Sequence, residues 1–564
     1  MKKIINKAII GVAAGALMVS SCDVLDLDPT GWYSETVPYS SVEKLDYYVK
    51  GFYSTLYTNA EISMGYSLTD GMSELLKYSW YGDKGEYNKV FYLDNYVTVE
   101  SNFLSNWSSM YTYIRRLNEY FYDLSNGRAA SLDADEVKIR TAEVRFLRAF
   151  AYQELVLRHG GVILRVAEDY VDGPNERAKA RSSKQECYDF ILSEYQKAAD
   201  DLPDTWDSSN TGRVTKGSAY GMIARAALYS GDYDKAIEAC DKVFELGYDM
   251  VPVSSGDDYY NKIFNTVGNK ELLLAVYFQQ GTGGANARQH NFNTYFCAPG
   301  DDTVLGVPNA GVGCCATPTD EYASSFDIKV GDNWETFSWD NIASYSNKPF
   351  ENRDIRFYAS ILYDGATWLG RTLNLKKDSG NYMTFATSGQ DNVHKTTTGY
   401  VIRKFLSDSK KINFTSILSG QYWVEQRAAE IYLIRSEAYA RKGDFAAAYT
   451  DLNKVRARVG LPEKSQTSSW DEYLPDLDKE RICELGLEGQ RYFDLIRWGK
   501  SVETLNGKRL HGVEITTNTD GSLKYDRVEV DTQDRKFASR MNIFPIPKGE
   551  LRNNNLCVQN DEWL

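Results

Sequence analysis

The segment from Glu425 to Gly460 constrains the fold of this chain more than any other. Its apolar residues return every three or four positions, as they do on one face of an α-helix. Gly443 and Asp444 interrupt this pattern, and they can end one helix and cap the next. The segment therefore predicts a helical hairpin, with small residues such as Ala448 where the two helices meet. One hairpin cannot bury both of its faces, so neighbours of the same kind are expected.

A second stretch, from Gly217 to Gly247, repeats this pattern earlier in the chain. Its turn, Gly231-Asp232-Tyr233, corresponds to Gly443-Asp444-Phe445, and Ala236 corresponds to Ala448. Both turns resemble the turn of the tetratricopeptide repeat, although two unrelated alanine-rich hairpins would give the same pattern. Because the hairpins are far apart in sequence, they predict a mainly α-helical scaffold with long insertions and not a regular solenoid.

The first 22 residues have the features of a secretory signal. Three lysines begin the chain, and Ala8 to Val19 is an apolar run that is too short to span a bilayer. Val19-Ser20-Ser21-Cys22 resembles a bacterial lipobox, in which the cysteine becomes the lipid-bearing first residue. An ordinary signal peptide that is cut nearby is the alternative. Cys22 is the predicted lipid anchor, since buried acyl chains can hold a protein at a membrane.

The acidity of the chain limits its partners. It has 64 Lys and Arg against 78 Asp and Glu, a formal charge of −14, and loss of residues 1–21 with their three lysines changes this charge to −17. Repulsion between like charges argues against a nucleic-acid partner and against simple adsorption on anionic lipid. No other segment reaches membrane-spanning length, so the mature chain is expected to be soluble apart from its lipid.

Motifs that would indicate catalysis or metal binding are missing from the sequence. The four histidines, His159, His290, His394 and His511, do not form a metal-ligand spacing, and no Cys-x-x-Cys pair occurs. Neither a Gly-x-Ser-x-Gly elbow nor a phosphate-binding glycine loop is found. Because carboxylates are abundant, counting them does not exclude a catalytic pair of the kind that glycosidases use. No sequence feature identifies such a pair. We therefore expect no enzyme, no metal and no cofactor.

Two aperiodic regions are rich in aromatic residues. Glu61 to Val97 and Gly281 to Leu418 both place Trp, Tyr and Phe among Gly, Asn, Asp and Ser. The second region is too long for a loop and too aromatic for disorder, so it predicts an irregular subdomain that packs on the helices. Any single ring in these regions can plug the scaffold, whereas a cluster of rings favours a binding surface.

A charged helix is expected from Glu480 to Trp498. Three glutamates spaced by four residues would repel one another, and arginines three residues away from acidic side chains can offset that repulsion. This pattern favours a lattice of charges that orients a structural helix. The expected pairs are Arg481 with Glu484, Arg491 with Glu488, and Arg497 with Asp494.

Four stretches, together with the lipobox-like Cys22, can be compared with a known family. They are EVRFLRAFAYQELVLRHGG at 143–161, PFENRDIRF at 349–357, ERICELGLEGQRYFDLIRW at 480–498 and IFPIPKGELRNNNLCVQN at 543–560. With these stretches in this order, the chain resembles the SusD/RagB family of outer-membrane lipoproteins of Bacteroidetes. The resemblance implies a helical scaffold with tetratricopeptide-like pairs and a loop-rich ligand-binding region. It also implies a surface protein that binds nutrients, usually glycans, and that caps a TonB-dependent transporter resembling SusC.

The expected domain organisation alternates helical and irregular parts. It consists of a signal peptide (1–21), a lipidated tether (22–40), a helical scaffold with an N-terminal aromatic loop (41–280), a loop-rich inserted subdomain (281–424), a second part of the scaffold (425–500) and an extended closing segment (501–564).

Carbohydrate binding has a physical basis in the two aromatic regions. Flat Trp and Tyr rings can cover the C–H faces of sugars, while Asn, Asp, Arg and Gln bond the hydroxyl edges. Trp80 and Tyr81 are the leading pair, because Gly82-Asp83 predicts a turn that would expose them. A shallow, preformed site is expected, and the alternative is the same architecture serving peptides or another nutrient. The candidate ligand-binding residues are Glu74, Trp80, Tyr81, Tyr295, Trp339 and Trp368.

Overall fold

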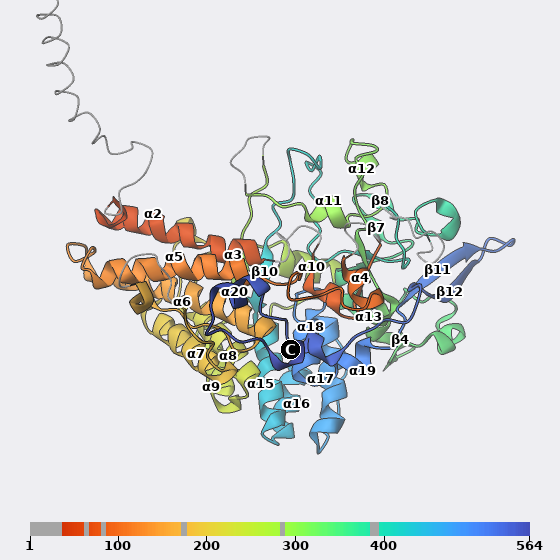
Figure 1. Cartoon of the computed structure of the whole chain (residues 1–564). Helices are drawn as coiled ribbons and strands as arrows, with labels where there is room; N and C mark the ends of the chain where they lie inside the picture. Colours follow the sequence, from red (N-terminus) through yellow and green to blue (C-terminus); the bar gives the residue numbers. More distant parts are fainter. Residues whose placement is uncertain (1–36, 61–66, 80–85, 171–177, 282–287, 384–393) are drawn as a thin grey trace, which may run out of the picture.

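The computed structural model describes residues 37–60, 67–79, 86–170, 178–281, 288–383 and 394–564. Within these ranges helices predominate, and the strands form six two-stranded antiparallel ladders. Figure 1 shows the long helices side by side across the lower part of the molecule, with short helices, strands and loops above them and to the right. Helices of the described ranges are not long and apolar enough to cross a membrane. The mainly α-helical, loop-rich fold predicted from the sequence is confirmed.

The helical scaffold is a continuous array of packed helices. Each long helix contacts the next, from α5 through α9, and α9 then contacts α15 across the long insertion (Figure 1). These helices are α5 (Trp107–Ser125), α6 (Ala134–His159), α7 (Lys184–Asp201), α8 (Lys216–Ser230), α9 (Tyr233–Glu245), α15 (Ala428–Arg441), α16 (Phe445–Arg458) and α17 (Trp470–Leu485).

Both predicted hairpins are present, as α8–α9 and α15–α16. Gly231 and Gly443 have φ angles of 86° and 84° at the two turns, a conformation that favours glycine. The side chains of Asp232 and Asp444 each accept a backbone N–H three residues further on and so cap the second helix. Because α9 packs on α15, the insertion leaves and re-enters the scaffold between two neighbouring hairpins.

Replacing Ala448 with leucine should lower the free energy of unfolding by roughly 1–3 kcal/mol. Ala448 is fully buried, and its carbonyl oxygen accepts the Ser436 hydroxyl of α15 at 2.6 Å, so added methylenes have no free space. The same cost is expected for Ala236→Leu in α9. Ala446→Leu is the matched control, because Ala446 is exposed on the same helix. Equal denaturation midpoints for all three variants would contradict this packing.

Shorter elements build the insertion and the layer over the scaffold. In Figure 1 α2 and α3 lie over α5 and α6, at the opposite end from the β11–β12 hairpin. The helices are α2 (Val42–Phe52), α3 (Ser54–Asn59), α4 (Glu86–Tyr92), α10 (Gly256–Phe264), α11 (Phe292–Phe296), α12 (Asp301–Val304), α13 (Asp320–Ser325) and α14 (Ile355–Ser360).

The paired strands are short except in two ladders. The longer ones are β2 (Leu272–Val276) with β10 (Trp423–Arg427), and β11 (His511–Thr517) with β12 (Leu523–Glu529). The others are β1 (Leu76–Tyr78) with β3 (Ala316–Pro318), β4 (Ile328–Val330) with β5 (Asn333–Glu335), β6 (Ile361–Leu362) with β9 (Val401–Ile402), and β7 (Thr367–Trp368) with β8 (Arg371–Thr372).

The C-terminal segment crosses the end of α6. It contains α18 (Arg491–Arg497), α19 (Ser501–Leu505), the β11–β12 hairpin and α20 (Lys548–Asn553). The N–H of Phe544 donates to the Arg158 carbonyl oxygen at 2.7 Å. The side-chain amide of Asn560 donates to the carbonyl oxygens of His159 and Phe544, at 3.1 and 2.8 Å. These bonds attach the chain end to the scaffold.

The expected single helix from Glu480 to Trp498 is wrong. The chain leaves helical geometry between α17 and α18, where Leu487 and Gly489 have φ angles of 68° and 77°. The expected pair of Arg497 with Asp494 is present at 2.8 Å. Of the other two expected pairs, neither forms: Arg481 instead contacts Asp494, and Arg491 contacts Glu74 and Asp478.

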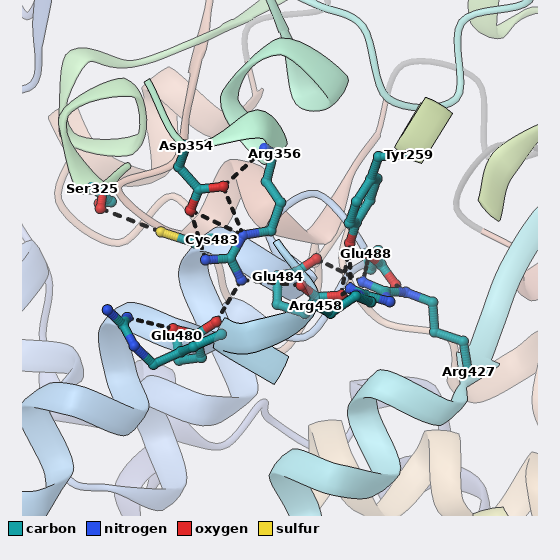
Figure 2. Close-up of polar contacts among 12 residues, drawn as sticks. Tyr259, Ser325, Asp354, Arg356, Arg427, Arg458, Glu480, Cys483, Glu484 and Glu488 are labelled. Carbon is teal, nitrogen blue, oxygen red and sulfur yellow. Dashed lines mark hydrogen bonds and ion pairs between the residues drawn. The ribbon is translucent and has the colours of Figure 1, made fainter. Parts of the chain in front are cut away.

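The three glutamates of this segment are neutralised from other parts of the chain. Figure 2 shows Arg356 of α14, Arg427 of β10 and Arg458 of α16 converging on Glu480, Glu484 and Glu488. Arg356 lies 2.5 Å from Glu480 and 3.1 Å from Glu484. Burial alone would raise the pKa of Glu484, but Arg458, Arg427 and Arg356 outweigh it and hold that pKa well below its usual range. The network fastens the insertion to α17.

Candidate functional site

The N-terminal aromatic region and the middle insertion meet at the β1–β3 ladder. Leu76 lies opposite Pro318, and Tyr78 lies opposite Ala316. One step further along, the N–H of Ser79 donates to the carbonyl oxygen of Cys315 at 2.9 Å, and the N–H of Cys315 donates to that of Tyr295 at 2.8 Å. The chain that continues from Ser79 towards Trp80 therefore begins beside α11.

Of the three rings of α11, only that of Tyr295 is partly exposed. Phe292 and Phe296 of the same short helix are buried, with ring centroids 4.6 Å apart, and fix the helix to the core. Tyr295 is only half-buried. Trp80 and Tyr81 lie outside the described residues, so their contribution to this face stays a prediction.

The described rings of the N-terminal aromatic region serve the core. Tyr78 stacks on Tyr87 at 4.4 Å, and both rings are buried. The ammonium group of Lys77 donates to Tyr92 and Asp531, both at 2.6 Å. Burial lowers the pKa of Lys77 to about 8 although Asp531 opposes this shift. These contacts hold β1 rigidly, which gives the residues after Ser79 a fixed starting point.

The sequence predicts that Glu74 accepts hydrogen bonds from a ligand, but its carboxylate does not face solvent. Its carboxylate accepts the Arg491 guanidinium, with the Nη2 atom 2.5 Å and the Nε atom 2.9 Å from Oε1. The Glu74 residue is buried in the core of the protein. A buried charge that loses its partner is costly, so Glu74 is needed where it is to anchor α18.

The two tryptophans from the insertion are tied to acidic side chains. Trp368 of β7 is 4% exposed, and its indole N–H donates to Asp301 at 3.1 Å. The expectation that Trp368 would be exposed is therefore wrong. Trp339 is half-buried, and its N–H donates to Asp320 at 2.8 Å. Trp368 and Trp339 are thus held by two different acidic residues of the insertion, and Tyr295 packs against Phe296 of its own helix.

The described titratable groups are arranged for structure. His159 and His290 are buried, and the only described contact of His511 with a carboxylate is with Glu321, at 2.6 Å. Among residues 37–564, outside the gaps given above, no group of three or more His, Cys, Asp or Glu could hold a metal ion. Glu484, whose pKa is held well below its usual range by arginines, is excluded from solvent.

Comparison with known families decides the classification. The model of the SusD family matches residues 270–563, about half of the chain, and a second model, described as starch-binding and associating with the outer membrane, matches residues 24–228. This chain belongs to the SusD family. Its resemblance to SusD/RagB proteins is thereby confirmed, and the family is one of carbohydrate-binding, non-catalytic proteins associated with the outer membrane.

Relatives of this SusD-family chain share its length and its fold. A SusD-like protein of Bacteroides ovatus is 22% identical over 530 residues, which cover 88% of this chain and 83% of the relative. The crystal structure of a SusD-like protein from Bacteroides fragilis matches with a TM-score of 0.77 at 26% identity, over 94% and 98% of the two chains. A laminarin-binding SusD-like protein shares the fold, with a TM-score of 0.64 at 21% identity over 93% and 100%.

Proposed function

We propose that this SusD-family protein captures glycans at the cell surface and passes them to a TonB-dependent outer-membrane transporter of the SusC type. Membership of the SusD family, through models that together reach both halves of the chain, is the observation that carries this proposal. The laminarin-binding neighbour with the same fold supports a glycan as the ligand. Cys22 is the proposed lipid anchor, which would hold the protein in the outer membrane with its ligand face outward.

The proposed glycan site lies where the N-terminal aromatic region meets α11. Tyr295 presents a half-exposed ring there, and its carbonyl oxygen is bonded to the strand that pairs with β1. Trp80 and Tyr81 follow β1 directly and are proposed to complete the surface. Rigid rings on a fixed support lose little conformational entropy when they cover a sugar face. Trp339 is a secondary candidate because part of its ring remains accessible.

Removal of the Tyr295 ring should weaken glycan binding without unfolding the protein. For Tyr295→Ala we expect at least a tenfold loss of affinity, equal to about 1.4 kcal/mol, for the glycan that the parent protein selects on a glycan array. Trp80→Ala and Tyr81→Ala should do the same. Tyr47→Ala is the matched control, since Tyr47 is 79% exposed on α2. Isothermal titration and thermal unfolding are measured side by side.

The alternative ligands give a different result in the same experiment. If the protein serves peptides or another nutrient, the array shows no glycan binding, and a peptide library binds in a manner that depends on Tyr295. Retained glycan affinity in all three ring variants, with unchanged melting temperatures, would instead place the glycan site away from the β1–α11 junction.

A further inference from the structure

A concave site lies between α3, the loop before α8 and the end of β2. It is a pocket of about 310 Å³, within the range of roughly 300–1,000 Å³ that is usual for small-molecule sites. Its lining combines rings, amides and cations, including Lys50, Tyr57, Asn210, Arg213, Tyr277 and Arg288. We call it the Tyr57 pocket.

The walls of the Tyr57 pocket are fixed by the backbone. Gly212 has a φ angle of 94°, and a Cβ atom there would lie 2.7 Å from the Tyr277 ring, so only glycine lets the loop approach that ring. Arg213 donates to Asn210 at 3.1 Å and holds the same loop. On the other wall, the N–H of Gln279 donates to the carbonyl oxygen of Arg288 at 2.8 Å.

Aromatic rings supply the apolar surface of the pocket. Tyr53, Tyr57 and Tyr277 line the pocket. The Tyr57 ring packs against Phe278, which lies outside the lining, with their ring centroids 5.1 Å apart. The guanidinium of Arg288 lies over the Tyr57 ring, 4.8 Å from its centroid. Stacking of this kind orients a planar guanidinium without occupying its N–H donors. The Arg288 side chain is thus held at the mouth of the pocket while it remains exposed.

Of the cations that line the pocket, Lys50 and Arg213 are neutralised by Asp46 and Glu143, whereas no described acidic side chain pairs with Arg288. The lining contains the cations Lys50, Arg213 and Arg288 and no Asp or Glu. Lys50 and Arg213 already contact Asp46, at 2.8 and 2.6 Å. Burial would raise the pKa of Asp46, but these two cations lower it to about 2, so Asp46 stays ionised. Within the described ranges no ion pair occupies Arg288, in a chain whose formal charge is −14.

We propose that the Tyr57 pocket binds a sugar residue that carries one negative charge, a uronate carboxylate or a sulfate ester. This inference rests on the proposed glycan-binding function and narrows its ligand class. The planar N–H fork of Arg288 matches two oxygens of such a group. The Tyr57 ring holds Arg288 in place, and the half-buried Tyr277 ring of the lining offers its surface to a C–H face of the sugar. The lining of the Tyr57 pocket includes no residue of β1 or α11.

The test is a glycan array of neutral, uronate-bearing and sulfated oligosaccharides, probed with the full chain in detergent. We expect acidic oligosaccharides among those bound, and an affinity that falls as salt rises, because salt screens exposed charges. Arg288→Met should weaken binding of the acidic ligand by tenfold or more and flatten its salt dependence. Tyr57→Leu should weaken the same ligand while keeping apolar bulk at the site.

Arg509→Met is the matched control for charge. Arg509 is partly exposed and lies two residues before β11, and the β11–β12 hairpin is at the far end of the molecule from α3 (Figure 1). Its replacement removes one surface cation and should leave the affinity unchanged. Binding of neutral glycans alone, or acidic binding that Arg288→Met leaves intact, overturns the inference but not the proposed function. An array without any bound glycan overturns both. The uronate and sulfate arms decide which anion is recognised.

Discussion

Replacing Arg427 with methionine should lower the free energy of unfolding by about 3–5 kcal/mol, because it removes one cation from a buried network and leaves the carboxylates of that network in excess. Arg427 is fully buried and lies 2.8 Å from Glu271, 2.6 Å from Glu484 and 2.8 Å from Glu488 (Figure 2). It also donates to the Glu484 carbonyl oxygen at 2.7 Å. If the chain unfolds as one unit, the melting temperature should fall by roughly 3–4 °C.

A paired substitution tests the cause of this loss. Arg427→Met combined with Glu488→Gln also removes one negative charge from the network, so the double variant should be more stable than Arg427→Met alone. Lys404, the other partner of Glu488 at 3.0 Å, still donates to the carbonyl oxygens of Glu484 and Gly486. Lys242→Met is the surface control, since the pair of Lys242 with Glu245 is exposed to solvent and such pairs contribute little. A melting temperature for Arg427→Met equal to that of the parent would show that the network does not stabilise the fold.

The sequence predicted the hairpins but not this network, because the two depend on different ranges of contact. The turn at Gly443 and the cap at Asp444 lie within the segment that they organise. Arg356, Arg427 and Glu484 come from separate segments that only tertiary packing brings together. The sequence alone suggested ion pairs between residues three positions apart on one helix. Only the pair of Arg497 with Asp494, both on α18, forms as predicted.

The solvent exposure of the candidate site residues could not be predicted from their neighbours in the sequence either. Trp368 has small and polar neighbours in the chain, yet Asp301 from another part of the insertion accepts its indole N–H and the ring is buried. The sequence around Tyr57 and Arg288 does not indicate a pocket. Tyr57 lies at the end of a helical pattern, and Arg288 lies in a polar stretch. They are neighbours only because β2 ends beside α3.

Two buried histidines should make the protein sensitive to acid. The Nε2 atom of His290 donates to the Gln421 carbonyl oxygen at 2.9 Å, and its Nδ1 atom accepts the N–H of Phe292 at 3.2 Å. A second proton on the ring, at Nδ1, would therefore point at the N–H of Phe292. Burial lowers the pKa of His290 to about 4. His159 is bonded at both nitrogens too, and burial, with the charge of Arg158, lowers its pKa to about 3.

The free energy of unfolding depends on pH because the folded and unfolded chains bind protons at the histidines with different pKa values. Unfolded histidine has a pKa near 6.5, so above that pH neither state binds the proton and the stability is fully present. As the pH falls below 6.5, the unfolded chain takes up protons that the folded chain refuses. Each histidine then costs about 1.4 kcal/mol per pH unit until its folded pKa is reached. At pH 5 this amounts to about 2 kcal/mol for each ring.

Two buried carboxyl groups act in the opposite direction. Burial raises the pKa of Asp70 to about 7 and that of Asp301 to about 6. Their folded forms keep a proton that the unfolded chain has lost, so they add stability as the pH falls from about 7 towards 4. The pH curve of the parent protein therefore mixes both signs, and single variants are needed to separate them.

His290→Asn and His159→Asn should each be less stable than the parent at pH 7.5, because contacts are lost. That difference should shrink by about 2 kcal/mol for each variant at pH 5, since asparagine does not titrate. Urea unfolding midpoints at the two pH values measure the change. Asp70→Asn keeps an acceptor for the N–H of Gly489, which lies 2.9 Å from Asp70. The stability of the parent relative to this variant should increase from pH 7.5 to pH 5, opposite to the change for the histidine variants. A difference for His290→Asn that does not vary with pH would mean that His290 is protonated alike in both states.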